Sequence, residues 1–177
     1  MRVCVFCGSS PGRRPVYAEV AAAVGRLLAS RGHGIVFGGG DRGLMGSLAR
    51  AATLAGGEVI GVIPQALLEA EMTQSVATEL RVVAGMHARK TLMYELASAY
   101  LILPGGLGTL DEVFETLTWG QLGLHQKAVA LLNIAGYFDP LLDLLDQAIS
   151  EGFVEERQRA LLRVCREPLE LVGVLDL

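Results

Sequence analysis

Short continuous apolar runs alternate along the chain with longer stretches in which apolar residues recur at helical spacing. The runs predict strands at residues 3–6, 35–37, 59–63, 80–83, 100–103 and 128–132. They are continuous rather than alternating in polarity, which is typical of strands that are buried on both faces of a parallel sheet.

Three stretches between and after these runs place apolar residues on one face of a helix. Their members are Val16, Val20, Ala23, Val24, Leu27 and Leu28, then Leu110, Val113, Phe114 and Leu117, then Leu141, Leu144, Leu145 and Ala148. This alternation predicts an α/β protein with a doubly wound parallel sheet and right-handed crossovers. Because no linker or repeat interrupts the pattern, we expect one domain over residues 1–177. The segment after about residue 136 carries no motif, and we expect it to add packing helices.

Glycine-rich sequence follows three of the predicted strands, at residues 7–12, 38–43 and 104–109. In open α/β sheets, ligands bind outside the carboxyl ends of the strands. Glycine lets the backbone approach a ligand closely, and the following helix N-terminus offers free N–H groups to an anion. The sequence therefore predicts an anion site at the carboxyl ends of these strands, with phosphate as the expected anion.

Composition narrows the class of protein. Of the 177 residues, 51% are hydrophobic and 19% are charged, and the formal net charge is −4. These values exclude a disordered chain and argue against a nucleic-acid polymer as the main partner. The apolar runs end well before the ~18 residues of a membrane span, and the first run is too short for a signal peptide. The three cysteines do not make a disulfide framework. We therefore expect a cytoplasmic protein that does not bind membranes.

The second glycine-rich cluster matches the dinucleotide fingerprint G-x-G-x-x-G through Gly38, Gly40 and Gly43. The acidic residue expected about twenty positions further on would be Glu58. It precedes the next predicted strand, whereas a ribose-binding acid should lie at the end of that strand. The pattern alone is weak, so an NAD site is disfavoured.

The third cluster, residues 104–112, reads P-G-G-L-G-T-L-D-E. Thr109 and Glu112 have the spacing of a capping box, in which each side chain satisfies a backbone N–H at a helix start. That interpretation explains these two residues but not the glycines before them. No lysine follows the glycines, so the string is not a nucleoside-triphosphate loop. Backbone amides and Thr109 could hold a monophosphate here, and a carboxylate as close as Glu112 would be unfavourable unless the chemistry used it.

Other polar candidates are weaker. Arg89 shares a helix face with apolar residues, so it either extends its charge to solvent along that face or serves a site. Cys4 and Cys7 are spaced C-x-x-C, but their odd separation places them on opposite faces of a strand. His33, His87 and His125 show no ligand spacing, so no metal is implied.

Five strings together resemble the LONELY GUY family of cytokinin riboside 5′-monophosphate phosphoribohydrolases, which is also labelled lysine decarboxylase-like. They are residues 4–10, 38–46, 61–64, 86–90 and 104–112, and the resemblance runs from residue 4 to about residue 132. The most specific are P-G-G-x-G-T-x-x-E and M-H-x-R-K. The resemblance implies a Rossmann-like sheet, a homodimer, and no metal or organic cofactor.

The resemblance also implies site residues. Arg89 and Glu112 would form the catalytic pair, and Gly105, Gly106, Leu107, Gly108 and Thr109 would bind the phosphate and ribose end. The remaining candidate substrate-binding residues are Glu71, Lys90 and Thr118, together with Ser9, Gly39 and Gly40 of the first two clusters. Leu107 stands where plant members usually carry Tyr, and Asp111 replaces their usual Glu.

These residues suit cleavage of an N-glycosidic bond, which passes through an oxocarbenium-like sugar. Glu112 could stabilise that charge and activate water, while Arg89 could stabilise the leaving base or position Glu112. The expected substrate is N6-modified AMP, with plain AMP as an alternative. The alternative function is a non-catalytic nucleotide or molybdenum-cofactor carrier, which would not need Arg89 and Glu112 together. A lysine decarboxylase would need Lys90 or Lys127 as its Schiff-base lysine. It is discounted, because Lys90 sits in the R-K pair and Lys127 starts a predicted strand.

Overall fold

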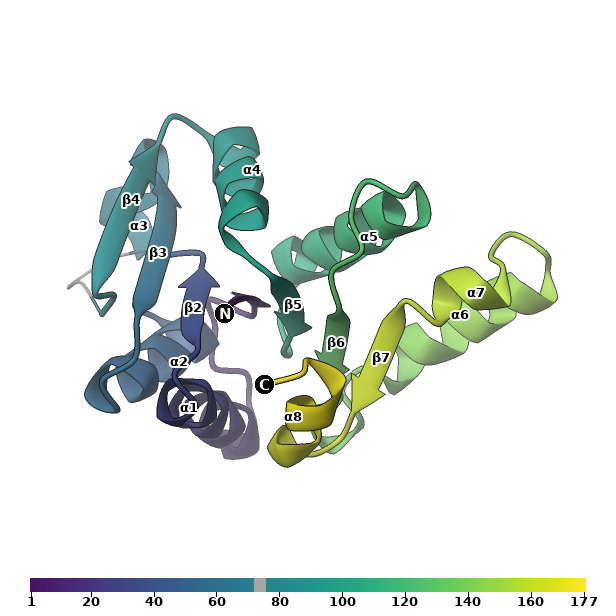
Figure 1. Ribbon diagram of the computed structural model, residues 1–177, viewed down its shortest axis with the longest axis horizontal. Helices are drawn as coiled ribbons and strands as arrows, with labels where there is room; N and C mark the ends of the chain where they lie inside the picture. Colours follow the sequence, from purple (N-terminus) through teal and green to yellow (C-terminus); the bar gives the residue numbers. More distant parts are fainter. Residues whose placement is uncertain (72–75) are drawn as a thin grey trace.

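The computed structural model describes residues 1–71 and 76–177, whose strands form one parallel sheet (Figure 1). Its order is β4-β3-β2-β1-β5-β6-β7. The strands are β1 (Arg2–Phe6), β2 (Gly34–Phe37), β3 (Val59–Pro64), β4 (Glu79–Val83), β5 (Ala99–Ile102), β6 (Val129–Leu132) and β7 (Leu162–Cys165). The prediction of a doubly wound α/β fold is confirmed. The direction of winding reverses between β1 and β5, so a ligand crevice is expected at their carboxyl ends.

Helices cover both faces of the sheet (Figure 1). They are α1 (Pro15–Ser30), α2 (Gly43–Leu54), α3 (Leu68–Glu71), α4 (Met86–Leu96), α5 (Leu107–Gln121), α6 (Asp139–Ser150), α7 (Glu156–Arg159) and α8 (Leu171–Val174). Short 3₁₀ turns occur at η1 (Gln65–Leu67), η2 (Ile134–Gly136) and η3 (Pro168–Glu170). Residues of α1, α2 and α8 pack on one face, and residues of α4, α5 and α6 pack on the other. Among the described residues, no helix has both the length and the apolar character to cross a membrane.

The core lies in two layers because alternate residues of each strand point to opposite faces. In β1, Val3 and Val5 join the layer under α1 and α2, whereas Cys4 and Phe6 join the layer under α4 and α5. Cys7 belongs to the first layer, so the prediction that it and Cys4 lie on opposite faces is confirmed. Full burial of such side chains stabilises the sheet by roughly 1.5–3 kcal/mol each.

The two edge strands differ from the sequence prediction. The run at 80–83 was expected to be buried on both faces, but β4 pairs only with β3 and leaves Val82 46% exposed. The prediction for the segment after residue 136 was packing helices, and the structure adds a strand, β7, which pairs with β6. Its apolar run is interrupted by Arg163, whose side chain leaves the strand and donates a hydrogen bond to the carbonyl of Val174. An edge position tolerates that charge, which hid the strand from a search for apolar runs.

Two predicted apolar stripes are also less buried than expected. Phe114 of α5 is 41% exposed, and Leu144 of α6 is 56% exposed. Leu110, Val113, Leu117, Leu141 and Leu145 of these stripes pack into the core layer under α4 and α5.

Candidate active site

A cavity of about 300 Å³ lies at the carboxyl ends of β1 and β5, where the winding of the sheet reverses. Its lining residues come from the loop after β1, from α2, η1 and α4, and from the start of α5. They are Cys7, Gly8, Ser9, Met45, Leu67, Met86, Arg89, Lys90, Gly106, Leu107, Gly108, Thr109, Asp111 and Glu112. The fold therefore gathers both predicted catalytic residues at one place.

The loop after β5 is packed tightly against its neighbours. The N–H of Gly8 donates a hydrogen bond to the carbonyl of Pro104 at 3.0 Å. A β-carbon at Gly105 would lie 2.1 Å from Oγ1 of Thr109 and 2.9 Å from the nitrogen of Gly8. Only glycine fits at position 105, so packing explains Gly105. Gly106 and Gly108 have open space where a β-carbon would lie, so packing does not account for them.

Helix α5 begins at Leu107 with Gly106 as its N-cap, and no side chain caps its first turn. Thr109 is thus the third helical residue, already inside the helix. The prediction that Thr109 and Glu112 form a capping box is wrong, because the helix starts earlier than that motif requires. The first N–H groups of α5 have no partner within the helix and carry its positive dipole end, which suits an anion.

Glu112 lies one helical turn into α5 and lines the cavity while half-buried. Burial raises the pKa of Glu112 to about 7, although the positive charges of Arg89 and Lys90 act in the opposite direction. Within the described part of the chain, its carboxylate makes no hydrogen bond or ion pair. At neutral pH this group can therefore either accept or give up a proton.

Arg89 of α4 is only 7% exposed, so its charge does not extend to solvent along the helix face. Nη1 lies 3.8 Å from the sulfur of Met86, and Nε is buried without a hydrogen-bond partner in the described residues. The guanidinium fills the space beside Gly38, where a β-carbon would lie 1.9 Å from Nη2. Among the side chains that the structure describes, no carboxylate pairs with this buried guanidinium, which favours an anionic or electron-rich ligand.

Lys90 is held by two carboxylates of α5. Its Nζ lies 2.7 Å from Oδ2 of Asp111 and 3.2 Å from Oε2 of Glu115. The hydroxyl of Tyr94 donates a further hydrogen bond to Glu115 at 2.7 Å. Burial lowers the pKa of Lys90, but the hydrogen bonds to Asp111 and Glu115 outweigh it and the net shift is upward. The lysine is therefore a fixed positive charge beside Glu112.

The structure does not bring every predicted site residue to this cavity. Thr118 lines a separate space of about 170 Å³ with Phe114 and Gln121. Gly39 and Gly40 are buried in the loop after β2 and are not among the described residues that line the cavity. Gly105 lines an adjoining cavity of about 230 Å³. Glu71 ends α3, and its side chain lies outside the described residues.

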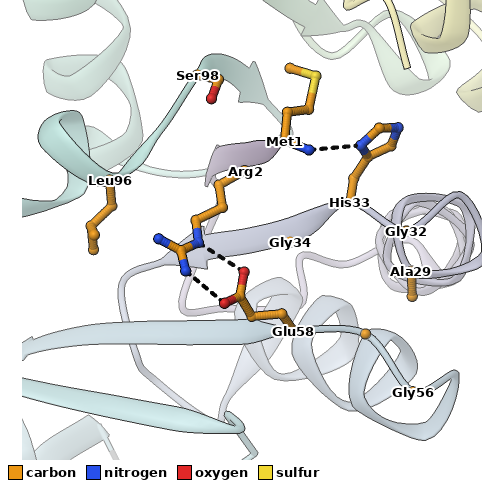
Figure 2. Close-up of a pocket in the computed structure, with 11 residues that line it drawn as sticks. Met1, Arg2, Ala29, Gly32, His33, Gly34, Gly56, Glu58, Leu96 and Ser98 are labelled. Carbon is orange, nitrogen blue, oxygen red and sulfur yellow. Dashed lines mark hydrogen bonds and ion pairs between the residues drawn. The ribbon is translucent and has the colours of Figure 1, made fainter.

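The glycines of the dinucleotide-like pattern have other uses. Gly38 makes room for Arg89, while Gly43 has φ +57 and would place a β-carbon 2.3 Å from the backbone of Ser9. Glu58, the acid that an NAD site would need, directly precedes β3 and so lies at the amino ends of the strands, away from the cavity. There it accepts two hydrogen bonds from Arg2 in a cavity of about 540 Å³ (Figure 2).

This opposite cavity is larger, but its polar groups already face one another. Figure 2 shows the guanidinium of Arg2 directed at Glu58 and the backbone nitrogen of Met1 directed at His33. The hydrogen bond from Arg2 lowers the pKa of Glu58. Neither Arg89 nor Glu112 lies there, so the catalytic assignment belongs to the smaller cavity.

Sequence reasoning missed several residues of the smaller cavity. Met45, Leu67 and Met86 line it as apolar walls, and Cys7, Gly8 and Asp111 line it as well. Of these residues, all except Leu67 lie within the strings that carry the family resemblance, which was a usable signal. Leu67 comes from a 3₁₀ turn with no motif, so only the fold could place it.

Comparisons with known proteins agree with the family resemblance that the five sequence strings carry. The family model described as "Possible lysine decarboxylase" matches residues 45–175. The Oryza sativa subsp. japonica protein named cytokinin riboside 5′-monophosphate phosphoribohydrolase LOG is 46% identical over 175 residues, which cover 99% of this chain and 72% of the rice protein. The Arabidopsis thaliana protein of the same name, LOG7, is 45% identical and is covered over 81% of its length. The likeness thus continues past residue 132, where the recognisable strings end.

Solved structures with the same fold are more distant in sequence. The molybdenum cofactor carrier protein from Chlamydomonas reinhardtii has a TM-score of 0.75 at 19% identity. The match covers 99% of this chain and 95% of the carrier protein's chain. The molybdenum cofactor binding protein from Rippkaea orientalis has a TM-score of 0.73 at 22% identity, covering 99% and 94%. At these identities the likeness shows the fold alone. With relatives at 45% identity or more over nearly its whole length, the chain belongs to the LONELY GUY family of cytokinin riboside 5′-monophosphate phosphoribohydrolases.

Proposed function

We propose that this protein is an N-glycosidase that hydrolyses cytokinin riboside 5′-monophosphates to the free base and ribose 5-phosphate. The relatives that carry this activity in their names support the reaction class. The observation that carries the proposal is the position of Glu112. This half-buried carboxyl has a pKa of about 7, lies one turn from the uncapped start of α5, and faces the same cavity as Arg89.

The substrate phosphate would bind at the start of α5. The backbone N–H groups of the loop and first helical turn, residues 105–109, supply donors, and the helix dipole favours a doubly charged anion there. Ser9 lines the same cavity from the β1 side and adds a hydroxyl. The ribose then extends towards Glu112, because that carboxyl lies one turn further along the same helix.

The reaction breaks the bond between C1′ of the ribose and N9 of the purine, and the bonding electrons leave with the base. Glu112, as a carboxylate, stabilises the positive charge on the sugar and takes a proton from the water that attacks C1′. That proton later passes to the departing base. Arg89 favours the carboxylate form, since its charge lowers the pKa of Glu112, and it can also stabilise negative charge on the base.

The competing functions have less support. A carrier needs no buried carboxyl with a raised pKa next to its ligand, and the carriers of similar fold share at most 22% identity with this chain. A lysine decarboxylase needs a lysine free to form a Schiff base. Lys90 is held by Asp111 and Glu115, and Lys127 donates a hydrogen bond to the carbonyl of Tyr94 at 2.6 Å.

The activity is tested by incubating the protein separately with N6-isopentenyladenosine 5′-monophosphate, AMP, N6-isopentenyladenosine and lysine, and then separating the products by chromatography. We expect free base and ribose 5-phosphate from the first nucleotide, a slower or absent release from AMP, and no reaction of the nucleoside, which lacks the phosphate. Release of cadaverine from lysine without any free base would reverse the ranking of functions.

We also propose that the active form is a homodimer in the cytoplasm. Leu107 lines the cavity and is 86% exposed, and Phe114, two turns further along the same face of α5, is 41% exposed. Met86 at the start of α4 is 46% exposed at the same cavity. Apolar side chains gathered at the rim of a site suit a surface covered by a second copy of the chain. The described cysteines are free and buried, which suits a reducing compartment.

A further inference from the structure

Tyr137 makes a hydrogen bond to the glycine loop from outside the catalytic cavity. Its hydroxyl donates to the carbonyl of Gly105, and the residue lines the adjoining cavity of about 230 Å³ rather than the one with Arg89 and Glu112. Gly8 and Gly106 line both cavities, so the loop forms a wall between them. A side chain on one side of this wall can therefore control backbone groups that face the other side.

The turn that carries Tyr137 is held in an unfavourable backbone conformation. Ala135 has φ 52 and Gly136 has φ 74, and the first of these is costly for a residue with a side chain. The buried Asn133 fixes the turn, because its amide donates to Asp139 at 2.6 Å and its oxygen accepts from the N–H of Phe138 at 2.8 Å. These bonds hold Tyr137 in a fixed direction.

The ring of Tyr137 is also supported by two aromatic neighbours. Its centroid lies 5.8 Å from that of Tyr17 and 4.8 Å from that of Phe138, both edge-to-face. Phe138 is 1% exposed and anchors the turn in the core. The hydroxyl of Tyr137 therefore reaches Gly105 from a rigid base, although the ring itself is 40% exposed.

The bond to Gly105 fixes the orientation of a peptide unit between two glycines, where no side chain restricts rotation. The carbonyl of Gly105 and the N–H of Gly106 belong to the same planar trans unit and point in opposite directions. With the carbonyl held towards Tyr137, the N–H of Gly106 points away from it. We propose that Tyr137 is a positioning residue that aims the Gly106 N–H at the substrate phosphate. This inference rests on the proposed phosphate site at residues 105–109.

The test compares Tyr137→Phe, which keeps the ring and removes the hydroxyl, with Tyr17→Phe as its matched control. Tyr17 is the other ring of the pair, and within the described residues its hydroxyl makes no hydrogen bond. For Tyr137→Phe we expect the dissociation constant of ribose 5-phosphate and the KM of the nucleotide to rise about three- to tenfold, with kcat changed by less than about twofold. Tyr17→Phe should leave both quantities unchanged.

Binding of ribose 5-phosphate is measured by titration calorimetry and needs no turnover, so it separates this inference from the proposed reaction. If the wild-type protein cleaves no nucleotide but Tyr137→Phe still weakens ribose 5-phosphate binding, the reaction is wrong and the positioning role stands. If binding is unchanged in Tyr137→Phe, if only kcat falls, or if the wild-type protein binds no ribose 5-phosphate, the inference is overturned. Melting temperatures within about 3 °C of the wild type would show that both variants fold.

Discussion

The guanidinium of Arg89 occupies the space that a side chain at Gly38 would take. A β-carbon at Gly38 would lie 1.9 Å from Nη2 and 3.0 Å from Cζ of Arg89. The loop after β2 thus serves the site indirectly, because the absence of a side chain there lets a buried cation stand beside Glu112. This relationship, and the raised pKa of Glu112, lead to the following predictions.

Gly38→Ala should displace Arg89 without disrupting the core. The methyl group would meet the end of a long side chain, which can move, so the melting temperature should fall by only a few degrees. A shift of about 1 Å in a catalytic group can cost about 100-fold in rate, and we expect kcat to fall by that order. Gly173→Ala is the control, because a β-carbon there meets open space. Wild-type kcat in Gly38→Ala would show that the position of Arg89 is not critical.

The stability of the protein should depend on pH through Glu112. Its pKa is about 7 in the folded state, against 4.5 for an ordinary glutamate, so the folded protein binds more protons than the unfolded chain between these values. This contribution to the free energy of unfolding is complete below about pH 4.5 and is lost as the pH rises through about 7. Glu112→Gln cannot ionise and resembles the protonated side chain at every pH, so the variant does not lose this contribution as the pH rises. We therefore expect the variant to melt close to the wild type at pH 5 and about 2–4 °C above it at pH 8.

A differential scanning measurement of both proteins at both pH values checks this expectation. Glu95→Gln, an exposed position on α4, should track the wild type throughout. An equal difference between Glu112→Gln and the wild type at pH 5 and pH 8 would contradict the raised pKa.

Removing the positive charge of Lys90 and removing the negative charge of Asp111 should shift the pH profile of kcat/KM in opposite directions. Lys90 lowers the pKa of Glu112 and Asp111 raises it. If the carboxylate form is active, kcat/KM rises with pH through about 7 in the wild type. Lys90→Met should shift that rise to higher pH, and Asp111→Asn should shift it to lower pH. Two shifts of the same sign, or none, would show that Glu112 is not the group seen in the profile.

The oligomeric state should respond to the exposed apolar face of α5. Phe114→Asp places a charge where the proposed homodimer buries an aromatic ring, so the protein should become monomeric. Native mass spectrometry at micromolar concentration checks this, with Leu144→Asp on α6, an exposed apolar residue outside that face, as the control. A wild-type protein that is monomeric under these conditions would contradict the dimer.

Most of the sheet could be predicted because its central strands are continuous apolar runs. The edges were less predictable: the strand at β4 was found but not its solvent side, where Val82 is exposed, and β7 was missed because Arg163 interrupts its apolar run. The glycine loop and Glu112 were found from one contiguous string. The capping box failed because the spacing of Thr109 and Glu112 does not reveal that α5 starts at Leu107.

Other parts of the site depend on contacts between distant segments. The pairing of Arg89 with Gly38, and of Tyr137 with Gly105, joins residues far apart in the chain, and neither pair has a spacing that a single sequence reveals. The two carboxylates around Lys90 lie on a different helix from the lysine itself. Such contacts become visible only once the order of the strands is known.

The most direct test of the account is the release of free base from N6-isopentenyladenosine 5′-monophosphate by Glu112→Gln, compared with the wild-type protein at saturating substrate. Glutamine keeps the shape of the side chain but can neither carry charge nor accept the proton of water. The account predicts equimolar base and ribose 5-phosphate from the wild type and a kcat lowered by about 10²–10³-fold in the folded variant. A folded Glu112→Gln protein that turns over at the wild-type rate would contradict it.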